Sequence, residues 1–255
     1  AALFNAPEAS LQEYRDTNVE GTRNVLEAAH ELGVARVVHC STVGVASGGE
    51  PPYAEDAPYA PPAWDKYETT KASGEKLVVE YHDRTGLPIV VIRPAQVYGP
   101  GDLGKVKFYK MVKKGVIVSP GGTLKHLIYI DDLCEAIEKA LSSSSGFGVP
   151  IIVAADAPVP LRELVRTAAA ALGVEPPAIK VPALPVTIAA TVVENVFGAL
   201  KRKPPIFRRS MNFFTKSVAF RIGNAERYLG FRAATATDEG VRRTVRWYRE
   251  HGYID

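Results

Sequence analysis

Cysteine is scarce in this sequence, whose 255 residues include only Cys40 and Cys134. Two cysteines cannot build a disulfide framework, and their spacing does not match that of metal ligands. Both lie in apolar segments, VVHCSTV and DDLCEAI, which predicts two buried, reduced thiols. We therefore expect no metal site and a cytoplasmic protein.

An excess of charge of one sign is also missing. The chain has 31 Lys and Arg against 28 Asp and Glu, a formal net charge of +3. This difference is too small to indicate nucleic-acid binding. With 46% hydrophobic and 23% charged residues, the composition is typical of a soluble globular protein. The length suffices for one large domain or for a core with an appended lobe.

Apolar strands alternate with helices through the first 156 residues. Gly33 and Gly86 are expected to end two of the helices, and Asp131 or Asp132 to cap a third at its N-terminus. This alternation predicts β-α-β units in a doubly wound parallel sheet, an α/β fold. The expected helices are 16–32, 64–86, 105–114 and 128–143, and the expected strands are 36–43, 87–99 and 149–156.

The pattern changes after residue 156. A helix is expected over 161–173, then an apolar stretch interrupted by prolines, and an amphipathic helix over 237–252 closes the chain. These segments predict a smaller, mainly helical lobe over residues 156–255.

Tyr67 and Lys71 stand four residues apart in YETTK, and Thr42 lies 25 residues upstream, at the end of a predicted strand. On a helix, residues four apart project from the same face. An ammonium beside a phenol lowers the pKa of the phenol, so Tyr67 becomes usable as an acid or base. A Thr42 hydroxyl would hold the oxygen of the reacting carbon. The trio therefore predicts proton transfer to and from an alcohol oxygen.

Several neighbouring residues have more than one interpretation. Ser41 could supply the hydroxyl in place of Thr42, which we favour. His39 lies within the strand and is interpreted as packing. His126 precedes an apolar segment, where packing is favoured over contact with substrate.

Several segments together resemble the extended branch of the short-chain dehydrogenase/reductase superfamily. This branch includes NAD-dependent epimerases and dehydratases and 3β-hydroxysteroid dehydrogenase-like enzymes. The segments that carry the resemblance are TNVEGTRNVLEAA (17–29), VVHCSTVGV (37–45), YETTK (67–71), VIRPAQVYGPGD (91–102), HLIYIDDL (126–133) and NAERYLGF (224–231).

The resemblance implies a Rossmann-like fold and gives roles to single positions. Tyr67 would be the general acid and base, Lys71 would hold the nicotinamide ribose, and Thr42 would bind the substrate oxygen. The cofactor, NAD or NADP, would also be contacted at Asn18, Pro94, Ala95 and Val97. Asn18 has an alternative interpretation as a residue at the start of its helix.

The resemblance further implies that residues 1–155 are the C-terminal half of an NAD(P)-binding domain. Part of the substrate lobe would be inserted near 105–125, and 156–255 would form its remainder. The family's N-terminal glycine-rich phosphate loop has no counterpart in this sequence, so we expect the sheet to be incomplete and dinucleotide binding to be weak. Residues 99–104 match G-x-G-x-x-G, but Pro100 lacks an N–H and Asp102 would repel a pyrophosphate.

Residues 183–200 are strongly apolar and precede a basic segment, KRKPPIFRR. Pro185 and Glu194 argue against a transmembrane span. Packing within the substrate lobe is favoured, and contact of residues 183–209 with a membrane surface is the alternative. This segment resembles sterol dehydrogenase-like members. A nucleotide-sugar substrate would instead need basic residues, for which Arg208, Arg209 and Arg221 are candidates.

The sequence thus predicts an NAD(P)-dependent oxidoreductase or epimerase that acts on a secondary alcohol or ketone of a nucleotide sugar or sterol-like molecule. The alternative is an inactive fragment or binding module without a phosphate loop. The resemblance also implies a homodimer through the helices 17–32 and 64–86.

Overall fold

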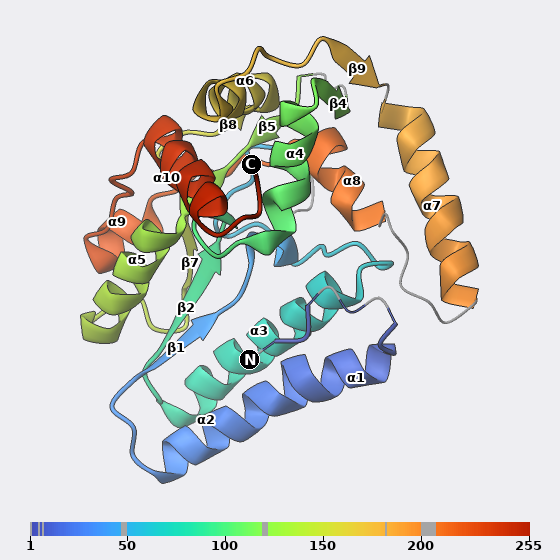
Figure 1. The fold of residues 1–255 in the computed structure, drawn as a ribbon. Coiled ribbons are helices and arrows are strands. Elements are labelled where there is room, and N and C mark those ends of the chain that lie inside the picture. The colour runs from blue at the N-terminus through green and yellow to red at the C-terminus, as the bar shows by residue number, and fades with distance from the viewer. Residues whose placement is uncertain are drawn as a thin grey trace. The chain divides into compact units, whose positions relative to one another are not determined.

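The computed structural model describes residues 2–4, 6, 8–46, 50–118, 122–181, 183–199 and 208–255. The chain forms two compact units (Figure 1). The first unit comprises Ala1–Ala95, Leu133–Ala154 and Phe220–Arg232. The second unit comprises Gln96–Asp132, Ala155–Ala219 and Ala233–Asp255.

The first unit is built on a parallel sheet of three strands in the order β1-β2-β7. β1 (Val37–Cys40) pairs with β2 (Ile89–Pro94), and β2 pairs with β7 (Pro150–Val153). The central strand, β2, is buried along its whole length. This burial explains the continuous apolar run that predicted it.

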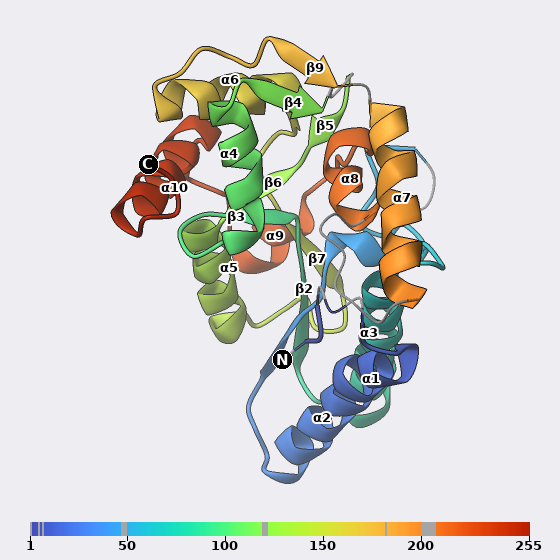
Figure 2. The same cartoon turned by 45° about the vertical axis from the view of Figure 1, so that its right-hand side comes forward.

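Helices cover the sheet of the first unit (Figures 1 and 2). α2 (Gly21–Glu31) and α3 (Lys66–Thr85) lie together on one side, while most of α5 (Ile130–Ser142) and α9 (Asn224–Leu229) lie on the other. A core cluster joins α2, α3 and the sheet through Leu26, Val78, Tyr81, Ile89 and Val91. The predicted α/β fold with a parallel sheet is confirmed.

The first helical segment begins earlier than the sequence predicted. Ser10 caps α1 (Leu11–Arg15) in a reciprocal capping box with Glu13, and a π-helical turn, Asp16–Glu20, continues into α2. The predicted start at residue 16 was wrong because the Ser-x-x-Glu signal at Ser10 was not used. At the other end, Gly33 has the positive φ expected after a helix.

α3 closely matches its prediction. The Asp65 side chain accepts hydrogen bonds from the backbone N–H groups of Tyr67 and Glu68, at 3.1 Å each. Gly86 ends the helix with a φ of 70°, a conformation in which glycine has no Cβ penalty. The Asp65 cap fixes where the helix begins and therefore which residues lie in its first turns, and Gly86 fixes where it ends.

The predicted strand 87–99 divides in two. β2 ends at Pro94 and β3 (Gln96–Tyr98) pairs with β6 (Leu127–Tyr129), within the second unit. The helix predicted over 128–143 therefore begins only at Ile130. Neither Asp131 nor Asp132 is its N-cap, since both lie in the first turn of α5. Within the second unit, Asp132 instead accepts hydrogen bonds from the Thr235 backbone and side chain.

The second unit has a mainly helical core with short strand pairs. α6 (Leu161–Leu172) and α10 (Thr237–Glu250) pack together with α4 (Val106–Lys113). β4 (Val116–Val118) pairs in parallel with β9 (Ile179–Val181), and β5 (Leu124–Lys125) pairs antiparallel with β8 (Val159–Pro160). The sequence did not predict these short pairs. α7 (Ala183–Ala199) packs on α8 (Arg208–Thr215).

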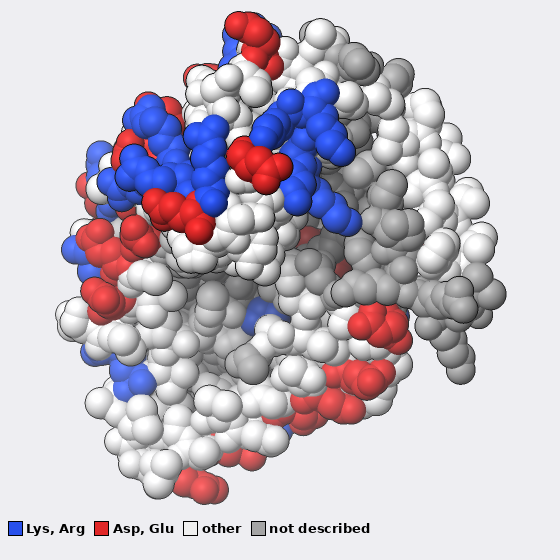
Figure 3. Space-filling model, viewed as in Figure 1, with Lys and Arg blue, Asp and Glu red and all other residues white. Residues whose placement is uncertain are grey.

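Lys and Arg side chains gather over α4 and α10 of the second unit (Figure 3). On α10, Arg242 forms ion pairs with Asp238 and Glu239, and Arg243 forms one with Glu239. Exposed pairs at helical spacing of this kind are usual on a solvated helix face. The basic surface of α10 therefore needs no nucleic-acid partner to explain it.

The predicted burial of both cysteines was wrong. Cys40 and Cys134 are exposed. Cys40 is the last residue of β1, which lies at the end of the strand order, and Cys134 lies on α5. Apolar neighbours in sequence did not bury either thiol, so burial gives no support to a particular redox compartment.

Candidate functional site

The side chain of Lys71 is fixed between α3 and β1. It is 5% exposed, and its Nζ donates a hydrogen bond to the main-chain oxygen of Cys40 at 2.7 Å. Tyr67 stands one helical turn before Lys71 on α3. The hydrogen bond therefore holds the end of β1 beside the helix face that carries the Tyr-Lys pair.

A second close approach joins the loop after β1 to the first turn of α3. A Cβ placed on Gly44 would lie 2.6 Å from the Glu68 carboxylate. Thr42 lies between Cys40 and Gly44, so it is brought to the same junction as the start of α3. Thr42 Oγ1 accepts a hydrogen bond from the Gly44 N–H at 3.3 Å, which leaves its own O–H proton available as a donor.

Burial sets the electrostatics of this junction. It lowers the pKa of Lys71, while the nearby Cys40 and Glu75 oppose this shift. Burial and the Lys71 charge also lower the pKa of His39, to about 3. His39 is therefore neutral at physiological pH, in agreement with its interpretation as a packing residue.

Two polar atoms at the end of β1 are buried and have no hydrogen-bond partner among the described residues. They are His39 Nε2 and Ser41 Oγ. A buried hydroxyl without a hydrogen-bond partner costs free energy unless a bound molecule supplies that partner. Ser41 thus stays open as an alternative to Thr42 for the hydroxyl role.

Asn18 is a buried anchor for the N-terminal segment. Its Oδ1 accepts from the Leu3 N–H at 2.7 Å, and its Nδ2 donates to the Leu3 carbonyl and to Thr70 Oγ1. It is 2% exposed and lies in the middle of a continuous helical segment, so it is not a helix-start residue. Its side chain fastens residue 3 to α3, and its predicted contact with a cofactor remains a prediction.

This anchor places Phe4 against the Tyr67 ring. The two ring centroids are 4.8 Å apart with an interplanar angle of 74°, an edge-to-face contact. Phe4 is nevertheless 52% exposed. Sequence reasoning missed Phe4, because nothing in its local pattern indicates a contact with a residue 63 positions away.

The remaining predicted cofactor contacts lie around the end of β2. Pro94 and Ala95 are buried in the first unit, and the Ala95 N–H donates to the Val153 oxygen at 2.9 Å. Val97 lies on β3, in the second unit. The structure therefore groups Pro94 and Ala95 with the trio in one compact unit, and Val97 with the other.

The turn at residues 99–104 is occupied by the second unit's own atoms. A Cβ on Gly99 would lie 2.4 Å from the Ile130 side chain. Asp102 Oδ1 accepts from the Gly104 N–H at 3.0 Å, and its other oxygen pairs with Lys105 at 2.7 Å. This G-x-G-x-x-G segment is a packed structural turn, which agrees with its rejection as a phosphate loop.

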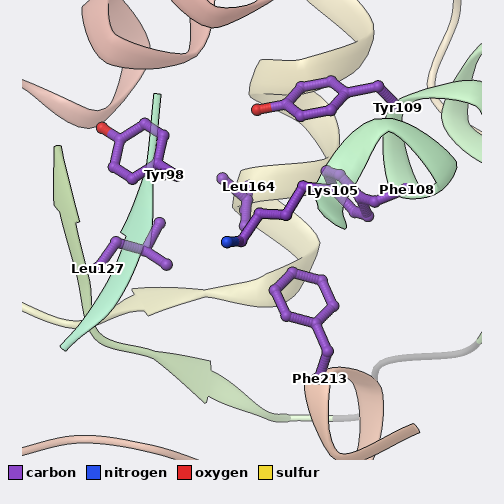
Figure 4. Close-up of a pocket in the computed structure, with 7 residues that line it drawn as sticks. All are labelled: Tyr98, Lys105, Phe108, Tyr109, Leu127, Leu164 and Phe213. Carbon is purple, nitrogen blue, oxygen red and sulfur yellow. The ribbon is translucent and has the colours of Figure 1, made fainter. Parts of the chain in front are cut away.

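The second unit contains a small internal cavity (Figure 4). Its lining is mostly apolar, and the Lys105 amine points into it between Leu127, Leu164 and Phe213. Lys105 Nζ donates to the Val97 carbonyl at 2.5 Å. The free volume is about 10 Å³, which is no more than one water molecule needs. The cavity is too small for a substrate in this structure.

The remaining candidate residues for substrate contact lie in different surroundings. His126 is fully buried, and its Nε2 lies 2.6 Å from the Ala155 oxygen, as expected for a packing residue. Arg221 is exposed on the first unit. The side chains of Arg208 and Arg209 lie outside the described residues. Within the described part of the chain, every helix is too short or too polar to cross a membrane.

Residues 2–154 match the model of the NAD dependent epimerase/dehydratase family. The chain belongs to this family of enzymes, in the extended short-chain dehydrogenase/reductase superfamily that the sequence motifs resemble. NAD is accordingly the family's cofactor.

Related proteins include a hydroxysteroid dehydrogenase and a nucleotide-sugar epimerase. The chain is 28% identical to a 3β-hydroxysteroid dehydrogenase/decarboxylase, isoform 1, of Arabidopsis thaliana over 94% of its own length and 60% of the relative. It is 26% identical to a UDP-glucuronate 4-epimerase of Thermodesulfobacterium geofontis over 93% of its length and 67% of the relative. The chain thus spans about 60% of the plant enzyme.

A solved structure shares the fold. The UDP-glucuronic acid 4-epimerase of Bacillus cereus, in complex with NAD, aligns with a TM-score of 0.72 and 21% identity. The alignment covers 94% of this chain and 70% of that protein. The Rossmann-like fold is therefore confirmed.

Proposed function

We propose that Tyr67, Lys71 and Thr42 form the proton-transfer end of an NAD(P)-dependent oxidoreductase or epimerase site. The observation that carries this proposal is the buried Lys71 ammonium, fixed to the end of β1 one turn after Tyr67. A bound nicotinamide would supply or accept the hydride. Tyr67 would transfer the proton of the substrate hydroxyl, and Thr42 or Ser41 would hold the substrate oxygen.

The residues present fit the nicotinamide-ribose end of such a cofactor. An ammonium has three N–H donors, and among the described residues Lys71 uses one of them, toward Cys40. Two donors remain for ribose hydroxyls, and the unpaired Ser41 hydroxyl lies two residues beyond His39 on the same strand end. The fit concerns the ribose end alone, since residues 99–104 do not cradle phosphates.

This placement suggests different binding roles for the two units. The first unit contains the trio and the parallel sheet, so we assign it to the cofactor. The second unit contains most of the sequence after residue 155 and the apolar core around α6 and α10, so we assign it to the substrate.

Phe4 favours an apolar substrate over a nucleotide sugar. Its half-exposed ring lies edge-on to Tyr67, so apolar surface borders the reacting group. A substrate whose reacting carbon lies in a hydrocarbon framework would bury this ring, whereas a hydroxyl-rich sugar would lose water without gaining hydrogen bonds. The relative from Arabidopsis thaliana is named for a hydroxysteroid, which is consistent with this choice.

The test is cofactor-dependent turnover of a cyclic secondary alcohol and of a UDP-sugar, with NAD and with NADP. Tyr67→Phe should lower kcat by about 10²-fold or more, since it removes the general acid and base. Tyr228→Phe, which removes a phenol from α9, is the matched control. If no cofactor-dependent turnover is found with either substrate, the binding-module alternative holds instead. Turnover that Tyr67→Phe leaves unchanged would contradict the role of Tyr67.

A second proposal concerns α7. One face contributes Val186 and Ala190 to the core of the second unit. The opposite face carries four exposed apolar side chains at four-residue spacing, 51% to 71% exposed: Leu184, Ile188, Val192 and Val196. The sequence places five basic residues at 201–209 directly after it. We propose that this face binds an anionic membrane surface.

Sedimentation with phosphatidylserine-rich vesicles tests this second proposal. Replacing Ile188 and Val192 by Gln should abolish binding, while Gln at the exposed Leu103 of the same unit should not. Vesicle binding that survives the double change would contradict the proposal.

We also propose that a second copy of the chain binds through α2 and α3. Val25 of α2 and its C-cap residue Leu32 are 61% and 81% exposed. Sedimentation equilibrium should show a dimer that Val25→Glu converts to a monomer. A monomeric wild-type protein would contradict this assembly.

A further inference from the structure

A fully buried ion pair lies one helical turn beyond Lys71. Arg93 of β2 and Glu75 of α3 have side chains 2% and 0% exposed. Arg93 Nε lies 3.0 Å and 3.2 Å from the two Glu75 oxygens, and its NH2 lies 2.5 Å from Oε1. Such a bidentate contact fixes both the distance and the orientation of the carboxylate.

Further groups hold this pair in place. The Tyr59 hydroxyl donates to Glu75 Oε1 at 2.9 Å, and Arg93 NH1 donates to the Glu55 main-chain oxygen at 2.9 Å. The Glu55 carboxylate in turn accepts the backbone N–H groups of Ile152 and Asn224. The loop that carries Tyr59 and Glu55 is thereby tied to β7 and to the start of α9.

Glu75 is placed where it can act on Lys71 without bonding to it. The two residues are four apart on α3, a spacing at which a carboxylate and an ammonium can pair directly. In this structure Arg93 and Tyr59 engage the carboxylate, while the Lys71 ammonium is bonded to Cys40. The negative charge of Glu75 still opposes the effect of burial on the Lys71 pKa.

We propose that Glu75, held by Arg93 and Tyr59, is the positioning residue of Lys71. Its carboxylate stabilises the charged form of the ammonium. Because Arg93 holds this carboxylate, it does not draw the ammonium away from Cys40 and Tyr67. This inference rests on the proposed role of Lys71. Sequence reasoning assigned no role to either Glu75 or Arg93.

Few charged and titratable groups surround Lys71, so the effect of each on the Lys71 pKa can be considered in turn. α3 contributes Tyr67 and Glu75, β1 contributes His39 and Cys40, and β2 contributes Arg93, which is paired with Glu75. Since His39 has a pKa of about 3, it is neutral across the range in which a lysine titrates. Cys40 adds negative charge only when its thiol ionises. At neutral pH, Glu75 is thus the anion that supports the ammonium.

The experiment is an NMR titration of the Lys71 side chain in protein labelled with ¹³C at lysine Cε, assigned with Lys71→Arg. Glu75→Gln keeps an acceptor for Arg93 and Tyr59 but removes the charge. The Lys71 pKa should then fall by about one unit, a tenfold change in its ionisation constant. Glu80→Gln, an exposed charge on the same helix, is the matched control and should leave the Lys71 pKa unchanged.

A second variant covers the case in which Glu75→Gln does not fold. Arg93→Lys keeps the positive charge but loses the planar fork, so Glu75 can turn toward Lys71. The Lys71 pKa should then rise. An unchanged Lys71 pKa in a folded Glu75→Gln, or in Arg93→Lys when Glu75→Gln does not fold, would overturn the proposal.

The titration requires neither turnover nor cofactor. A failure of the proposed enzyme function is therefore distinguishable from a failure of this inference. If turnover is measurable, Glu75→Gln should lower kcat more than it raises KM, since Lys71 acts on the reacting Tyr67. A merely structural role for the ion pair would change stability and leave the Lys71 titration in place.

Discussion

Lys71 Nζ and the main-chain oxygen of Cys40 are joined by a 2.7 Å hydrogen bond, although the two residues are 31 positions apart. This bond ties α3 to the end of β1, the two elements that supply Tyr67, Lys71 and Thr42. The carbonyl therefore positions the ammonium, and the ammonium positions the loop that begins at Thr42.

Replacing Lys71 by Met separates its chemical from its structural contribution. Met keeps the length of the side chain but not the charge, and burial already disfavours the charged form. We expect a loss in kcat of about 10²-fold, while the free energy of unfolding falls by no more than about 1 kcal/mol. Urea denaturation and steady-state kinetics check the two halves. A large loss of stability would show that Lys71 is mainly structural.

The low pKa of His39 predicts that the folded protein loses stability in acid. Its pKa is about 3 in the folded state and about 6.5 in the unfolded state, so the unfolded chain binds the extra proton between these values. The contribution of neutral His39 to the free energy of unfolding is fully present above pH 6.5. It is lost as the pH falls toward 3, at up to roughly 1.4 kcal/mol per pH unit. His39→Leu should flatten this slope in urea denaturation at pH 7 and pH 5. His30→Gln, at an exposed position, is the matched control.

The apolar ring of Phe4 beside Tyr67 predicts a preference for apolar substrates. Phe4→Lys places a polar group beside Tyr67 in place of an apolar ring, so KM for a cyclic secondary alcohol should rise about tenfold, with a smaller change in kcat. Phe4→Leu, which keeps the surface apolar, should stay close to wild type. Equal KM values for all three proteins would show that the substrate does not touch this ring.

The close packing at Gly74 predicts that the contact between α3 and the π-helical turn does not tolerate a larger side chain. A Cβ at Gly74 would lie 2.6 Å from the Asn18 main-chain oxygen, which cannot move without shifting the helix. Gly74→Ala should therefore lower the free energy of unfolding by about 1–3 kcal/mol. At Gly21 the nearest atom, the Asp16 oxygen, is at an ordinary 3.6 Å. Gly21→Ala should raise stability by up to about 1 kcal/mol. The opposite result at Gly74 would contradict the packing.

Sequence patterns gave the main elements because their signals are local. The helix 64–86 was predicted to within two residues at each end. Its end followed from Gly86, whereas the N-cap signal of Asp65 was not used. The strand 87–99 was placed correctly in sequence but not divided. Its apolar run continues through Ala95, and only the partner strands, β7 and β6, reveal that it serves two units.

The site could be predicted only in part for the same reason. Tyr67 and Lys71 share a helix face by spacing alone, so their proximity followed from the sequence. Phe4 and Arg93 reach the same region through tertiary contacts that no spacing rule contains. The four-residue spacing of Lys71 and Glu75 on one helix, in contrast, already indicated that these two side chains lie close together. Asn18 was found by resemblance, but its bonds to Leu3 and Thr70 depend on the path of the N-terminal segment.

A double-mutant cycle between Tyr67 and Lys71, read as cofactor-dependent kcat, tests the central claim most directly. If the two residues act as one unit, Tyr67→Phe together with Lys71→Met should lower kcat no more than Tyr67→Phe does alone. Losses that multiply would show two independent roles. Undiminished turnover in Tyr67→Phe would contradict the account altogether.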